Sequence, residues 1–173
     1  MNPVQDDMGD HIGPNAADYI DVELHNSTNP SIIEASFTNQ ILGTNGVCQI
    51  TIPSSLSDAY YIVIKHRNSI ATWSAIPISF NGQNIFYNFT DAVNRAYGDN
   101  LKQVASGVYA IFVGDVNQDE LVDGSDMSET EIDNNNFISG YVSTDVNGDG
   151  LVDGSDMSLV ENSNNSFVSV INP

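Results

Sequence analysis

The stretch GDVNQDELVDGSDMS (residues 114–128) returns as TDVNGDGLVDGSDMS (residues 144–158). Residues 114–143 align without gaps onto residues 144–173, and 17 of the 30 positions are identical. A gap-free internal repeat indicates a fold built from two copies of one structural unit. The repeat therefore marks residues 114–173 as one tandem unit.

Oxygen-bearing side chains recur in both copies at positions 1, 3, 5, 9 and 12 of a twelve-residue loop counted from its first Asp. Position 7 is leucine, which can offer only its backbone carbonyl. This is the ligand spacing of the EF-hand loop, and Ca²⁺ takes six to eight oxygens at about 2.3–2.6 Å. The spacing predicts two Ca²⁺ ions, with ligands Asp115, Asn117, Asp119, Leu121, Asp123 and Asp126 in the first loop and Asp145, Asn147, Asp149, Leu151, Asp153 and Asp156 in the second.

Acidic side chains are concentrated in the same unit. The chain has 23 acidic and 4 basic side chains, and residues 114–173 hold 13 of the acids with no Lys, Arg or His. Such a surface repels phosphate backbones and anionic lipids, so a nucleic-acid partner is excluded. The longest apolar run, from Ala59 to Ile64, is too short for membrane insertion. Four carboxylates in one loop repel one another, and a bound divalent cation would remove most of that repulsion.

Short runs of alternating apolar and polar residues fill the chain before the repeats. The candidate strands are residues 19–25, 31–37, 47–52, 59–66, 70–79, 84–89 and 107–113, with one short helix over 90–97. Seven short strands in about a hundred residues predict a mainly β chain folded as a β-sandwich. The predicted organisation is an irregular lead-in at 1–16, a sandwich at 17–113 and the calcium-binding repeat at 114–173, in which a short helix follows each loop.

Residues 115–126 and 145–156 resemble the type I dockerin repeat. With YYIVIKHRN (60–68), WSA (73–75), AYG (96–98) and GDVN (114–117), the chain is similar to a C-terminal module of large secreted Bacteroidetes proteins. The resemblance implies an Ig-like or transthyretin-like β-sandwich followed by a dockerin-like unit with two EF-hand-type loops. It also implies an extracellular or cell-surface location, as the C-terminal part of a larger secreted protein.

The family also suggests how the module meets a partner. A further strand usually precedes the segment that matches residues 1–9, and no signal peptide is visible there, so we expect a truncated or processed chain. An open sheet edge near the N-terminus would then accept a strand from a protein partner or from a second copy. Docking onto a cohesin is a further implication. Against cohesin, positions 10 and 11 are Gly-Ser instead of Ser-Thr, and the helices that follow carry no basic residue.

Catalysis has no supporting motif. The three histidines lie far apart in the sequence, and neither a serine nor the single Cys48 stands in a nucleophile turn. The predicted function is therefore a non-catalytic, calcium-binding module with a structural, adhesive or assembly role. The alternative is a carbohydrate-binding module appended to a secreted enzyme. An exposed coplanar pair among the aromatic residues Tyr60, Tyr61, Trp73, Phe86 and Tyr87 would favour it.

Three finer expectations concern single positions. Position 6 prefers a positive φ, which suits Gly150 but costs Glu120 roughly 1–2 kcal/mol, so the first loop should bind Ca²⁺ more weakly. Val122 and Val152, at position 8, should point inward and bridge the two loops. The basic run Lys65–Arg67 should brace the sandwich by pairing with acids of the repeat.

Overall fold

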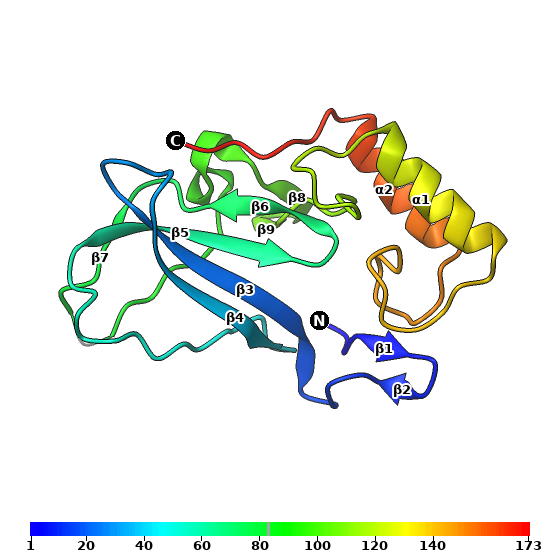
Figure 1. Cartoon of the computed structure of the whole chain (residues 1–173), viewed down its shortest axis with the longest axis horizontal. Coiled ribbons are helices and arrows are strands. Elements are labelled where there is room, and N and C mark those ends of the chain that lie inside the picture. The colour runs from blue at the N-terminus through cyan, green and yellow to red at the C-terminus, as the bar shows by residue number, and fades with distance from the viewer. Residues whose placement is uncertain (83) are drawn as a thin grey trace.

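The computed structural model describes residues 1–82 and 84–173 (Figure 1). Two α-helices, α1 and α2, lie side by side at one end of a mainly β structure, which confirms the predicted class. Neither helix is long and apolar enough to cross a membrane, nor is any other helix in the described ranges. The elements are β1 (Gln5–Asp6), β2 (Gly9–Asp10), β3 (Ala16–Asn26), β4 (Ile33–Gly43), β5 (Ala59–His66), β6 (Ser69–Trp73), β7 (Ile78–Ser79), the 3₁₀ turns η1 (Val93–Arg95) and η2 (Tyr97–Asp99), β8 (Lys102–Ala105), β9 (Val108–Ala110), α1 (Gly124–Asn135) and α2 (Gly154–Asn164).

An antiparallel sheet with the strand order β4-β3-β5-β6 forms the centre of the molecule, and β7 also pairs with β5. Its central strand β3 buries Ile20, Val22 and Leu24, the alternating apolar residues that predicted it. One edge strand of the sheet is β4. In the described part of the chain, its outer side is bridged only at Leu42, which pairs with Cys48. The amino group of Met1 donates to the carbonyl of Thr44 at 2.7 Å, so this end of the edge strand lies beside the N-terminus.

Two predicted strands and the predicted helix are absent from the described residues. Residues 47–52 make only the bridge at Cys48, and residues 84–89 form no strand. Residues 70–79 are divided between β6 and β7, because Pro77 has no N–H to continue the ladder. The helix expected at 90–97 is replaced by η1 and η2. The strands therefore build one five-stranded sheet and the small pairs β1–β2 and β8–β9.

The N-terminal segment is not the irregular lead-in that was expected. Its strands β1 and β2 pair in antiparallel fashion, and the hairpin packs against the second repeat. The N–H of Gln5 donates to the carbonyl of Gly148 at 2.9 Å, and the buried Val4 donates to the carbonyl of Ala17 at 2.8 Å. The segment therefore links the sheet to the second loop.

The sheet and the repeats share a hydrophobic core instead of meeting at a polar boundary after residue 113. Ile70 of β6 is fully buried among apolar residues of the repeat, Val116, Val122, Val146, Val160 and Val168. A cluster of this kind ties the two parts into one packed body.

The basic run meets the repeat at this junction through Arg67, whose partners there are a carbonyl and the ring of Tyr141 instead of the acidic side chains that were expected. Arg67 donates to the carbonyl of Val142 and, at 3.3 Å, to the carboxylate of Asp18. Next to it, the Asn68 amide donates to the carbonyl of Asp145 at 3.1 Å. The acidic partners of the run thus lie in β3: Asp18, which is also 2.8 Å from His66 Nε2, and Glu23, which is 3.2 Å from Lys65 Nζ.

Candidate metal centre

Each predicted loop runs directly into a helix, as the repeat indicated. The helix α1 begins at position 10 of the first loop, and α2 begins at the same position of the second. The position-9 residues, Asp123 and Asp153, are the N-caps, and each forms a reciprocal capping box with the Asp at position 12. Capping satisfies backbone N–H groups that a helix start leaves unpaired. The local sequence thus fixes where each loop ends.

The carboxylates at positions 1 and 12 lie at the buried centre of each loop. Asp115 is 2% exposed, and Asp126, Asp145 and Asp156 are completely buried. Asp126 accepts hydrogen bonds from the N–H groups of Val116 at 2.8 Å and of Asp123 at 2.9 Å. The loop closes around these two carboxylates, because they accept the N–H groups that its turns leave unpaired.

These central carboxylates have no cationic side chain from their own unit. Residues 114–173 contain no Lys, Arg or His, and none of the ion pairs in the described ranges includes a loop aspartate. Burial, together with the negative charge of Asp126, raises the pKa of Asp115 to about 6. Burial also raises the pKa of Asp145, although the N–H of Gly150 and the charge of Arg67 partly offset it. Both loops therefore hold negative charge in a place that disfavours it.

The side chains at positions 3, 5 and 9 are bound to neighbouring groups of the loop surface. The Asn117 amide donates to Asp119 at 3.1 Å and to Ser125 Oγ at 2.9 Å, while Asp123 accepts the N–H of Ser125 at 2.7 Å. Asn147, Asp149 and Asp153 repeat this pattern.

In residues 1–82 and 84–173, no three His, Cys, Asp or Glu side chains come together as a group that could hold a metal ion. The structure thus gathers two of the four aspartates of each loop at its centre and leaves the other two on its surface.

The backbone of the first loop is strained at two positions. Glu120, at position 6, has φ 75°, as expected for a residue that turns the chain sharply, and Gln118, at position 4, has φ 60°. The second loop places Gly148 and Gly150 there, at φ 79° and 85°. The strain at position 4 was missed, although Gly148 could have indicated it.

The position-8 valines are buried, as predicted, but the two loops do not bridge each other. Leu121 of the first loop bridges Ser169, which follows α2, and Leu151 of the second bridges Ser139, which follows α1. The N–H of Val122 donates to the carbonyl of Val168 at 2.9 Å, and the N–H of Val152 donates to the carbonyl of Ile138 at 3.1 Å. Each loop is therefore held by the segment that follows the helix of the other repeat.

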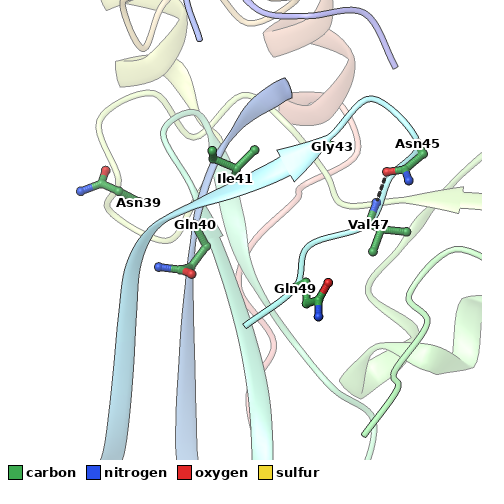
Figure 2. A pocket seen from close by; sticks show the side chains of 7 residues that line it. All are labelled: Asn39, Gln40, Ile41, Gly43, Asn45, Val47 and Gln49. Atoms are coloured by element: carbon green, nitrogen blue, oxygen red, sulfur yellow. Dashed lines mark hydrogen bonds between the residues drawn. The ribbon is translucent and has the colours of Figure 1, made fainter. Parts of the chain in front are cut away.

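A pocket of about 520 Å³ lies beside the end of β4 (Figure 2). Its lining is free of charged side chains and consists of Asn39, Gln40, Ile41, Gly43, Asn45, Val47 and Gln49. Of the five aromatic residues considered for a sugar platform, Tyr60 and Trp73 are buried, Phe86 is exposed, and Tyr61 meets Trp73 edge-on at 66°.

Comparisons with known protein families, with curated proteins and with solved structures find no match to this chain, so the functional argument rests on the geometry of the loops.

Proposed function

We propose that the chain is a non-catalytic, calcium-dependent extracellular module with a structural or adhesive role. The observation that carries this proposal is the pair of buried carboxylates in each loop, which no basic residue of residues 114–173 neutralises. Burying an unpaired charge costs several kcal/mol, and proteins normally offset that cost with a partner or a metal. A divalent cation is the partner that an all-oxygen loop of this spacing accepts.

The residues that would hold the two ions are those of the two twelve-residue loops. Asp115 and Asp126 would supply charge from the buried centre of the first loop, and Asp145 and Asp156 would do so in the second. Asn117, Asp119 and Asp123, with their counterparts, would supply further oxygens from the loop surface, and Leu121 and Leu151 would supply backbone carbonyls. Ca²⁺ contributes charge neutralisation, which lowers the net charge of residues 114–173 from −13 to −9.

Binding at these loops would stabilise the whole chain and not the repeats alone. The repeat core includes Ile70 of the sheet, and the second loop carries the N-terminal hairpin through Gln5 and Gly148. Anything that binds only the folded form raises its stability. EF-hand sites of extracellular modules have Kd values of about 10⁻⁴–10⁻³ M, so the unit would be fully folded only where calcium is plentiful. A dockerin-like module of a larger secreted protein fits this behaviour.

The test compares thermal unfolding of the wild type and the Asp115→Asn/Asp145→Asn variant, each with calcium and with chelator. We expect calcium to raise the unfolding midpoint of the wild type only. In chelator, the variant should still fold, because asparagine removes the unfavourable charge and keeps one acceptor oxygen. Its NH2 group replaces an oxygen that accepts a backbone N–H, and this loss offsets part of the gain. A wild type indifferent to calcium would refute the proposal, as would a variant that still responds fully.

Carbohydrate binding is the second candidate, and the pocket beside β4 is the observation that favours it. Four carboxamides, from Asn39, Gln40, Asn45 and Gln49, offer donors and acceptors to a neutral polyhydroxylated ligand. A glycan array with the wild type and the Gln40→Ala variant tests this. A sugar bound equally by both proteins would place its site elsewhere.

A further inference from the structure

Two phenylalanines occupy equivalent places in the repeats and stand almost completely in solvent. Phe137 is 89% exposed and Phe167 is 88% exposed. Both also adopt the left-handed backbone conformation, with φ 54° and 53°. The same unusual combination thus occurs twice, at positions exactly one repeat apart in the alignment of residues 114–143 with 144–173.

The left-handed turns cap the two helices, since the N–H of Ile138 donates to the carbonyl of Asp133 at 3.0 Å and the N–H of Val168 to the carbonyl of Ser163 at 3.2 Å. Such a cap does not need a phenyl ring. A left-handed conformation disfavours a bulky side chain, and helices that end this way normally use glycine or asparagine. Asparagines are abundant just before both sites, at Asn134–Asn136 and at Asn164 and Asn165, yet phenylalanine stands where the chain turns left-handed. An exposed phenyl ring also gains nothing from burial. Backbone strain that recurs at an exposed aromatic residue indicates a function outside the fold.

Each phenylalanine lies beside the calcium loop of the other repeat. Antiparallel pairing sets Ser139 opposite Leu151, and the N–H of Val152 donates to the carbonyl of Ile138, so Phe137 immediately precedes the segment that pairs with the second loop. Leu151, in that loop, is 56% exposed. In the same way, Phe167 immediately precedes the segment that pairs with the first loop, in which Leu121 is also exposed. The helices α1 and α2 run in opposite directions (Figure 1), so the two Phe–Leu pairs lie at opposite ends of the helix pair.

We propose that Phe137 with Leu151, and Phe167 with Leu121, are two equivalent anchor sites for a protein partner that presents an apolar pocket rimmed by Lys or Arg. Exposed aromatic residues are the usual anchors of protein interfaces. The acidic surroundings favour Lys or Arg at the rim of the partner's pocket, because residues 114–173 carry 13 acids and no base. The inference rests on the proposed function, since calcium in each loop would hold the adjacent anchor in place.

The same charges argue against other occupants. An anionic membrane would be repelled by the acidic unit. A second copy of the chain would be a poor partner, because three of its four basic side chains already face acids of their own chain, Lys65 at Glu23, Arg67 at Asp18 and Arg95 at Asp91.

The first arm of the test measures stability in the presence of calcium. Asparagine tolerates the left-handed conformation, so the Phe137→Asn/Phe167→Asn variant should unfold at the same temperature as the wild type or a few degrees higher. Phe86→Asn is the matched control, because Phe86 is 82% exposed and its φ is not positive. A clear fall in the midpoint of the double variant, but not of Phe86→Asn, would show that the two rings serve the fold and would overturn the proposal.

The second arm uses a defined probe, per-6-amino-β-cyclodextrin, whose apolar cavity accepts a phenyl ring and whose rim carries ammonium groups. In calorimetric titrations with calcium, we expect the wild type and Phe86→Asn to bind it at least tenfold more tightly than the double variant does. Equal binding of uncharged β-cyclodextrin by the wild type would overturn the basic rim. Self-association lost in the double variant would identify a second copy as the occupant instead.

A calcium titration of every variant separates the two proposals. If calcium binds but probe binding does not depend on the phenylalanines, the anchor sites fail alone. If calcium does not bind, the proposed function fails with them.

Discussion

Replacing Glu120 by glycine should tighten calcium binding at the first loop. The structure holds Gln118 and Glu120 at φ 60° and 75°, where each side chain costs about 1–2 kcal/mol. The second loop has glycine at both positions. If closing around an ion enforces this geometry, the first loop is weaker by up to about 2–4 kcal/mol, which is between one and three powers of ten in Kd.

The single change Glu120→Gly removes one of the two strained positions. It releases about 1–2 kcal/mol, while the greater freedom of glycine in the open loop takes back about 0.4–1 kcal/mol. The net gain of about 1 kcal/mol corresponds to a roughly fivefold lower Kd. Because the change also removes a negative charge, Glu120→Gln is the matched control, which loses the charge but keeps the strained side chain.

Calorimetric titration on an Asp149→Ala background, in which the second loop is disabled, isolates the first loop. The reciprocal Asp119→Ala background isolates the second. Both residues are exposed, so truncation should leave the fold intact. The reasoning is wrong if Glu120→Gly binds no more tightly than Glu120→Gln, or if the first loop proves the tighter site.

Three further outcomes are expected. Calcium at a hundredfold excess over Kd at both loops should increase the free energy of unfolding by about 5 kcal/mol and raise the calorimetric unfolding midpoint by about 10–20 °C. Magnesium, which resists dehydration, should increase the free energy of unfolding much less. Burial raises the pKa of Asp18, but its hydrogen bonds to His66 and Tyr141 outweigh this and lower the pKa to about 2, so the ionised form stabilises the fold above pH 4. In denaturant titrations, the free energy of unfolding of the wild type should fall by about 2 kcal/mol more than that of Asp18→Asn between pH 4 and pH 2, because both proteins keep Glu23, whose pKa is also lowered. Ile70→Ala should lower the free energy of unfolding by about 2–5 kcal/mol and still give one cooperative transition. The control Ile76→Ala, at a 63% exposed position, should change it by less than about 0.5 kcal/mol. Separate transitions for the sheet and the repeats would contradict the shared core.

The sequence predicts best those features that arise from local patterns. β5 covers residues 59–66, as expected, and β3 extends the predicted strand at 19–25 by a few residues at its ends. Both strands lie inside the sheet, where alternation reflects a buried face. The segments 47–52 and 84–89 have a similar composition but lack a pairing partner along their length. Strand composition shows that a segment can pair, and only the fold supplies the partner.

In the candidate site too, local features could be predicted from the sequence and long-range contacts could not. Loop spacing predicted that a helix follows each loop, since capping is a local property, but not that the helices begin inside the loops, after the N-caps Asp123 and Asp153. Three features depend on contacts far apart in the sequence and were missed: the pairing of each loop with the other repeat, the N-terminal hairpin on the second loop, and Ile70 within the repeat core. The exposure of Phe137 and Phe167 was missed as well, because aromatic residues are ordinarily assigned to a core.

The crosswise pairing of the repeats makes each half incomplete by itself. In the loop of the first half, the N–H of Val122 donates to the carbonyl of Val168 in the second half. In the segment after α1, the carbonyl of Ile138 accepts the N–H of Val152. A fragment ending at residue 143 therefore keeps every aspartate of its loop and still loses the strand partner that holds the loop closed. Two such fragments could complete each other only by exchanging tails, as domain-swapped dimers do. Duplication within one chain turns that exchange between molecules into an intramolecular contact, which makes closure of the unit independent of protein concentration.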